Sequence, residues 1–248
     1  MRRHSLLGAL FMLATWFSSC TYTHSSYVLT MGSAASANQV RWTPDPKRGS
    51  ASSTMSGGRR GSAAATCVSN SDSDSDRLDP AVTLLVPNGS VVLTTKAQPT
   101  LAWYLESEQA VDMEFVLHHP EHADPVYTKA LKSATGLMEV ALPDSAALEV
   151  GVPYRWTVFV SCNDSDFSVH TRSFVERIEA PDELTLPIAS SLDQASFYAS
   201  QGIWYDALNL LIGAYRQDAQ SAALVELRSL LQQADAEVPI ELSLSVES

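Results

Sequence analysis

Apolar and polar residues alternate with a period close to two from Ala81 to about Arg177. Side chains on a β-strand point to opposite faces of the sheet in turn, so this alternation predicts strands with one buried face. The runs are short, and turn residues such as those of Pro87-Asn88-Gly89 separate them. Such spacing predicts an antiparallel β-sandwich over residues 81–180. About eight strands are expected, at 82–86, 91–94, 100–105, 113–117, 126–131, 137–142, 154–160 and 168–175.

From about Leu186 the apolar residues recur every three or four positions, which predicts helices over 191–200, 203–216 and 219–234. Tyr198, Gly202, Trp204 and Ala207 stand at offsets that resemble one tetratricopeptide repeat. A solenoid needs about three repeats, so residues 186–235 are expected to form a helical hairpin that packs on the sandwich or mediates association. Residues 236–248 are expected to be a tail.

Leu148, Gly151 and Tyr154 lead into a predicted strand at intervals of three. This pattern resembles the tyrosine corner of immunoglobulin and fibronectin type III domains, in which the tyrosine hydroxyl bonds to the backbone nearby. Trp103 and Trp156 are then expected in the core, on facing sheets. The predicted fold is mainly β with α: an antiparallel, immunoglobulin/fibronectin-III-like β-sandwich followed by a tetratricopeptide-like helical hairpin.

Residues 1–37 are predicted to be a secretory signal, because two arginines precede an apolar stretch from Leu6 to Phe17. That stretch is shorter than the ~20 residues that cross a bilayer, so no membrane span is expected after signal processing. The protein is expected to be exported to the periplasm, the outer envelope or the medium. Cleavage has two interpretations. Phe17-Ser18-Ser19-Cys20 resembles a lipobox, which makes Cys20 a candidate lipid anchor, whereas Ala35-Ser36-Ala37 is a cleavage motif that gives a soluble secreted form.

Residues 38–80 are rich in Ser, Gly and Asp and poor in large apolar side chains, which predicts a disordered linker. Alternate aspartates from Asp72 resemble the start of a calcium loop, but Arg77 and Thr83 occupy the positions of its glycine and its last acidic ligand. An acidic, solvated linker is the favoured interpretation. The chain carries a net charge of −12 and no basic cluster, which argues against binding to nucleic acid or to anionic lipid.

The chain has three cysteines. If Cys20 is lipidated or removed, Cys67 and Cys162 remain, and in an oxidising compartment such a pair predicts a disulfide. Two free thiols are the alternative. No CxxC motif supports a redox or zinc site.

The strongest candidates for metal chemistry are His118, His119 and His122, because imidazoles suit zinc or copper. However, Pro120 marks a turn after a strand, so a surface loop without metal is the favoured interpretation. Hydrolase, nucleotide-binding and metalloprotease motifs are missing from the sequence. The chain is therefore expected to be neither an enzyme nor the carrier of a cofactor.

Several stretches along the chain share the order and spacing of one family. They are Gly58-Arg59-Arg60-Gly61 with Cys67, Leu85-Val86-Pro87-Asn88-Gly89, Leu93-Thr94-Thr95, Pro99-Thr100-x-x-Trp103-Tyr104-Leu105, Leu148-Glu149-Val150-Gly151-x-x-Tyr154-x-Trp156, Val160-Ser161-Cys162-Asn163 and Gly202-Ile203-Trp204-Tyr205-Asp206-Ala207-Leu208. Together they resemble the cyanobacterial family known as DUF928, a domain of unknown function, over about residues 57–235. The resemblance implies that the paired cysteines are a family feature, and it implies no activity. In this chain Ser62–Thr66 dilutes the glycine-rich stretch, and Val68 replaces the usual proline.

Three hypotheses about function follow. The first is a non-enzymatic envelope protein that binds an unidentified envelope partner through exposed aromatic residues of the helices, for which the candidates are Tyr198, Trp204, Tyr205 and Tyr215. Packing between helix and sandwich is the alternative for these residues and is favoured for Trp204. The second hypothesis is a metal- or glycan-binding envelope module, and the third is an uncharacterised hydrolase.

Overall fold

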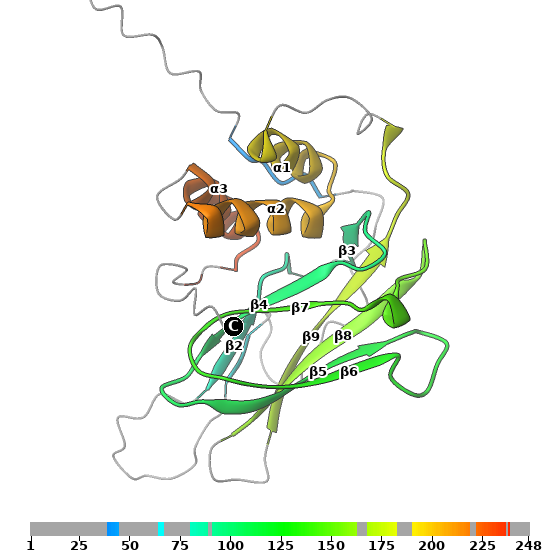
Figure 1. Ribbon diagram of the computed structural model, residues 1–248, viewed down its shortest axis with the longest axis vertical. Helices are drawn as coiled ribbons and strands as arrows, with labels where there is room; N and C mark the ends of the chain where they lie inside the picture. Colours follow the sequence, from blue (N-terminus) through cyan, green and yellow to red (C-terminus); the bar gives the residue numbers. More distant parts are fainter. Residues whose placement is uncertain are drawn as a thin grey trace, which may run out of the picture. The chain divides into compact units, whose positions relative to one another are not determined.

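The computed structural model describes residues 39–44, 64–66, 80–88, 91–162, 168–182, 190–218, 222–236 and 238. Two β-sheets come first in the chain, and three helices follow them (Figure 1). The prediction of β-sheets followed by C-terminal helices is therefore confirmed. In the described residues, three α-helices lie close to the predicted ranges 191–200, 203–216 and 219–234.

One sheet has four strands in the order β1-β2-β4-β7, and the other has five in the order β3-β9-β8-β5-β6. The prediction of a purely antiparallel sandwich is wrong at one place, because β3 pairs with β9 in parallel, with Thr94 opposite Arg177. The short chain between β2 and β3 crosses from one sheet to the other, which allows β3 to run alongside β9. The strands are β1 (Ala64–Thr66), β2 (Ala81–Leu84), β3 (Val91–Thr94), β4 (Thr100–Glu106), β5 (Val111–His118), β6 (Tyr127–Ser133), β7 (Gly136–Ala141), β8 (Pro153–Ser161) and β9 (Ser168–Arg177).

The core lies between the two sheets and follows from the alternation in the sequence. On β5, Met113 and Phe115 are buried whereas Glu114 between them is exposed. Trp103 on β4 and Trp156 on β8 are fully buried, and their ring centroids lie 6.4 Å apart. Both tryptophans are therefore core residues of facing sheets, as predicted.

The corner before β8 is held by hydrogen bonds between side chains and backbone. The backbone N–H of Glu149 donates to the hydroxyl of Tyr154 at 3.4 Å, which is the tie expected of a tyrosine corner. Arg177 donates from Nη1 to the carbonyl of Leu148 at 3.1 Å. Gly151 turns the chain here with φ of +79°, a conformation that favours glycine.

The three helices are α1 (Ser191–Ser200), α2 (Trp204–Gln217) and α3 (Ala222–Gln233). The hydroxyl of Ser190 accepts from the N–H of Asp193 at 3.1 Å and so caps the start of α1. Gly202 has φ of +76° and makes the turn between α1 and α2. In the described residues no helix is long and apolar enough to cross a bilayer.

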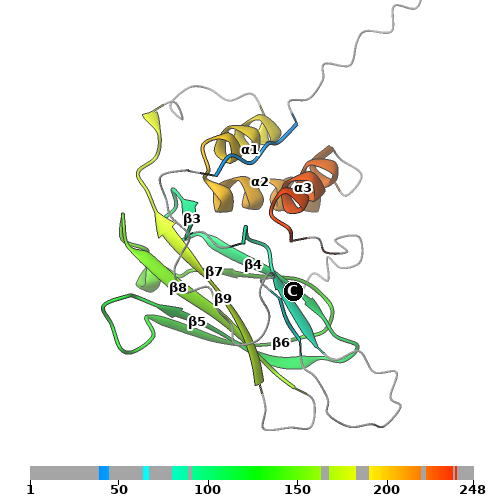
Figure 2. The same cartoon turned by 180° about the vertical axis from the view of Figure 1, so that it is seen from behind.

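The start of α2 covers the end of the sheets at which β2 stops and β4 begins (Figures 1 and 2). The indole N–H of Trp204 donates to the carbonyl of Leu85 at 2.8 Å, and the amide of Asn209 donates to the carbonyl of Thr100 at 3.0 Å. Tyr205 enters the core, where its hydroxyl accepts from the indole N–H of Trp156 at 2.8 Å. Burial raises the pKa of Tyr205, although hydrogen bonds with Trp156 and Ser173 oppose that rise.

Some predictions concern residues outside the described ranges. The predicted signal segment 1–37, the candidate anchor Cys20 and most of the tail 236–248 lie there. Two pieces of the segment 38–80, which the sequence predicts to be a linker, belong to the described fold. Residues 39–44 pack against the helices, and residues 64–66 form β1.

Candidate interaction site

The four aromatic side chains predicted as partner contacts are buried within the described structure. Trp204 and Tyr205 have no exposed surface, and Tyr198 and Tyr215 are 4% and 6% exposed. They pack the helices against one another and against the end of the sheets. Packing, the alternative that the sequence left open, accounts for their place, and none of the four side chains presents a contact surface to a partner.

A buried carboxylate on α2 joins the helices to the sheets. Asp206 is 3% exposed, and its two oxygens accept three hydrogen bonds. These come from the hydroxyl of Thr94 at 2.7 Å, the N–H of Thr95 at 3.0 Å and the hydroxyl of Thr95 at 2.6 Å. Two of the sequence stretches that carry the family resemblance meet at this contact. The place of both stretches in the family resemblance was a signal that these residues matter. The sequence alone does not indicate that they lie in contact.

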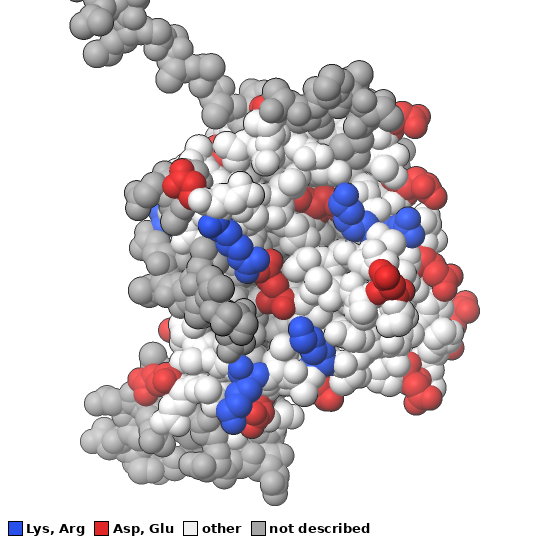
Figure 3. Space-filling view, in the orientation of Figure 1, with Lys and Arg blue, Asp and Glu red and all other residues white. Residues whose placement is uncertain are grey.

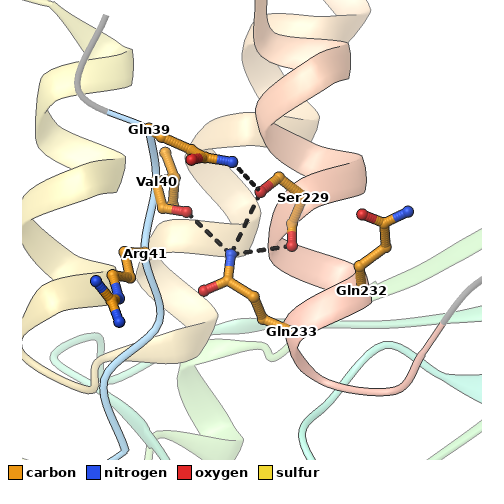
Figure 4. Close-up of a pocket in the computed structure, with 6 residues that line it drawn as sticks. All are labelled: Gln39, Val40, Arg41, Ser229, Gln232 and Gln233. Carbon is orange, nitrogen blue, oxygen red and sulfur yellow. Dashed lines mark hydrogen bonds between the residues drawn. The ribbon is translucent and has the colours of Figure 1, made fainter.

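An extended segment that lies along the helices was not predicted from the sequence, which indicated a disordered linker there. We name residues 39–44 the strap; in Figure 4 it runs as a blue ribbon between α1 and α3. Two side chains of α3 bind its backbone. The N–H of Val40 donates to Oε2 of Glu226 at 2.7 Å. Gln233 uses both ends of its amide, donating to the carbonyl of Val40 at 3.0 Å and accepting from the N–H of Trp42 at 2.7 Å.

The other side of the strap contacts α1, where the N–H of Thr43 donates to the carbonyl of Ala199 at 3.1 Å. The side chains of the strap alternate between the helices and solvent. Val40 is 1% exposed, and the ring of Trp42 packs edge-on against Trp204 with centroids 5.0 Å apart. Arg41, which lies between them, is exposed. The helices therefore hold the strap by its backbone and by alternate side chains.

An open pocket of about 620 Å³ lies beside the strap (Figure 4). The amide of Gln39 donates to the hydroxyl of Ser229 across it at 3.3 Å, whereas Gln232 stands at its edge. Its lining offers amides, a hydroxyl and one guanidinium, which suits hydrogen bonding to a polar chain rather than covalent chemistry. The lining residues are Gln39, Val40, Arg41, Ser229, Gln232 and Gln233.

The predicted metal candidates do not converge on one point. The rings of His119 and His122 stack with centroids 4.3 Å apart, and Nδ1 of His119 accepts from the N–H of Glu121 at 3.1 Å. His118 is the last residue of β5, paired with Arg155 of β8. Burial, and to a lesser degree the charge of Arg155, lowers the pKa of His118. Over the described part of the chain, no group of three or more His, Cys, Asp or Glu residues is placed to hold a metal ion.

The surface in Figure 3 carries acidic and basic side chains interspersed, with no large area of one sign. The exposed large apolar side chains of the described residues are Val150, in the corner before β8, and Val225, on α3. Val225 is 63% exposed. Val225, Ser229 and Gln232 follow one another at intervals of four and three, which places them on one face of α3. The exposed apolar side chain of Val225 thus lies on the same face of α3 as two residues that line the polar pocket.

Cys162 directly follows β8, is 9% exposed and is disulfide-bonded. Its two candidate partners, Cys20 and Cys67, lie outside the described residues. The pairing of Cys67 with Cys162 therefore stays a prediction.

Fold and site together define a two-sheet β protein whose helices cover one end and hold a segment of the same chain. Residues 55–241 match the model of a protein family, "Domain of Unknown Function (DUF928)", and the chain belongs to this family. No curated protein matches the chain. Among solved structures, the chain is similar to an AA10 lytic polysaccharide monooxygenase (LPMO) from Streptomyces lividans. The two are 16% identical with a TM-score of 0.25, over 36% of this chain and 62% of that one, which is too little to indicate a shared activity.

Proposed function

We propose that the chain is an exported, non-enzymatic protein-interaction module of the cell envelope, and that its helices bind the partner. The observation that supports this most directly is the strap, an extended segment that the helices hold through its backbone. Export follows from the apolar stretch Leu6–Phe17. A metal- or glycan-binding module of the envelope and a hydrolase are the competing hypotheses.

The proposal also includes the type of β-sandwich, the arrangement of the helices and the origin of the chain. An immunoglobulin/fibronectin-III-like sandwich is supported by the bond from Glu149 to Tyr154. A tetratricopeptide-like arrangement is supported by buried alanines, Ala199 and Ala207, where α1 and α2 pack closely. The cyanobacterial origin rests on the sequence resemblance alone.

The Cys67–Cys162 disulfide is supported by the strand register. Thr66, the last residue of β1, pairs with Ala81 at the start of β2. Short connections from β4 to β5 and from β6 to β7 join the two sheets at this same end, where β8 also stops. Thr66 and Cys162 therefore lie at the same end of the sheets, opposite the helices, and Cys67 is the next residue after Thr66 in the sequence.

The test of the proposed function is photo-crosslinking at defined surface positions in cells. A photoreactive residue at Val225, exposed on α3, is expected to give a discrete crosslinked species with an envelope protein. The matched control is Lys129, exposed on β6 of the sheets, which is expected to give none. Equal crosslinking at both positions, or none at Val225, would contradict a partner site on the helices.

A further inference from the structure

If the helices bind a partner as proposed, their specificity can be inferred from the strap. We infer that the groove between α1 and α3 recognises an extended peptide with a β-branched aliphatic residue and, two positions later, an aromatic residue. The strap is then a displaceable internal occupant that competes with such a peptide.

The backbone contacts give the groove its preference for an extended chain. Glu226 and Gln233 together satisfy two N–H groups and one carbonyl of the strap. These bonds involve main-chain atoms of the strap alone, so a peptide of different sequence can make them. Glu226 is 8% exposed, and a buried carboxylate requires a donor, which any occupant of the groove supplies with its own N–H.

The side-chain contacts give the sequence preference. Val40 is buried, and Trp42 packs against Trp204 through an edge-to-face contact that suits aromatic rings. Arg41 and Thr43 face solvent, so their positions in a peptide are free to vary. The pattern is therefore Val-x-Trp in this chain, and an aliphatic and an aromatic residue two apart in a partner.

Two observations distinguish the strap from an ordinary part of the domain. The family model covers residues 55–241, so Glu226 and Gln233 lie within the family domain whereas the strap lies before it. The strap also joins neither sheet, and the open pocket beside it leaves one side of the groove accessible. The groove thus belongs to the domain, and its occupant is a separate segment.

A tethered occupant competes strongly with a free one. Because the strap belongs to the same chain as the groove, its binding is intramolecular, and the effective concentration of such a segment can reach the millimolar range. A partner peptide of micromolar affinity is therefore excluded from the intact protein, unless it is abundant or the strap is released. The strap thereby sets the concentration that a partner peptide of given affinity must reach before it binds.

Peptide exchange on a nicked protein tests this inference. A site for a specific protease is inserted after Gly49 of the full chain, and the folded protein is cut there. A fluorescent peptide with the sequence Asn38–Pro46 is then added, and its anisotropy is measured. The cut protein is expected to bind the peptide saturably, at least about tenfold more tightly than the uncut protein does.

Matched variants make the test specific. The Gln233→Ala variant loses two hydrogen bonds to the strap backbone and is expected to bind the peptide about tenfold more weakly or worse. Gln232→Ala, next to it in the same pocket, is expected to bind as the parent protein does. A peptide with alanine in place of Val40 and Trp42 is expected not to bind.

The inference is overturned if the cut, folded protein does not bind the peptide, or if Gln232→Ala and Gln233→Ala weaken binding equally. Loss of the helical circular dichroism signal on release of the strap would overturn it too, because the strap would then be a structural element. These failures leave the crosslink at Val225 unaffected. A crosslink without peptide exchange retains the proposed function and rejects the inferred specificity.

Discussion

Asp206 shows how one residue can join two parts of the molecule. Its carboxylate is buried where α2 meets the end of β3, and three donors from Thr94 and Thr95 satisfy it. Hydrogen bonds to a charged group contribute more than neutral ones, and a buried group that loses its partner costs more still. The contact therefore fixes the position of α2 on the sheets more firmly than apolar packing alone.

Replacing Asp206 with alanine is expected to lower the free energy of unfolding by roughly 2–5 kcal/mol, because the donors of Thr94 and Thr95 lose their acceptor in a buried site. Urea denaturation followed by tryptophan fluorescence measures the change. The matched control is Asp112→Ala, which removes an exposed ion pair with Lys132 and is expected to cost less than about 1 kcal/mol. Equal losses in the two variants would refute the role of Asp206.

His118 gives a prediction for pH. Its pKa in the folded protein is lowered from the ordinary 6.5, first by burial and then by Arg155. Below about pH 6.5 the unfolded chain therefore binds more protons at this residue than the folded one, and stability falls as the pH decreases. The His118→Gln variant is expected to lose less stability than the parent between pH 7.5 and 5.5, as measured by urea midpoints. Parallel pH profiles for the two proteins would show that His118 does not contribute.

At the scale of elements, the sequence predicts the strands and helices whose apolar residues recur with a fixed period. The alternation on β5 and the three-to-four spacing on α2 both reflect burial of one face, so their bounds are predicted to within a few residues. The strap has no such signal. It is held through main-chain atoms by Glu226 and Gln233, whose side chains are distant in the sequence, and its short apolar content resembles that of a linker. The buried aromatics of the helices were similarly ambiguous, because an amphipathic pattern does not say what covers its apolar face.

The strap is expected to detach when its aromatic contact is removed. Trp42→Ala deletes the edge-to-face contact with Trp204, and truncating a half-buried tryptophan is expected to cost more than about 1.4 kcal/mol, which corresponds to a tenfold change in an equilibrium. The fraction of detached strap, and with it the rate of tryptic cleavage after Arg41, is expected to rise about tenfold. Mass spectrometry of timed digests measures that rate. An unchanged rate, with Thr43→Ala as the control for an exposed strap residue, would mean that Trp42 does not hold the strap.

At the scale of the whole chain, features that carry the family resemblance gather at the two ends of the sheets. Thr94 and Thr95 meet Asp206 at the end covered by helices, and Cys162 lies at the opposite end, where β8 stops. Between these ends the core is ordinary apolar packing, which many sequences can supply. The two ends are therefore where this chain departs from a generic sandwich, by a buried carboxylate at one and by the predicted disulfide at the other.

The Cys67–Cys162 disulfide would close a loop of about 95 residues, and crosslinks of that span contribute roughly 2–5 kcal/mol. A non-reducing peptide map of the exported protein is expected to contain one peptide pair that joins Cys67 to Cys162. Reduction is expected to lower the urea midpoint of the parent protein and to leave that of a Cys67→Ala, Cys162→Ala double variant unchanged. A map that joins Cys162 to Cys20 would contradict the pairing, and it would at the same time exclude Cys20 as a lipid anchor. That outcome would answer both questions at once, because a cysteine cannot carry a lipid and a disulfide on one sulfur.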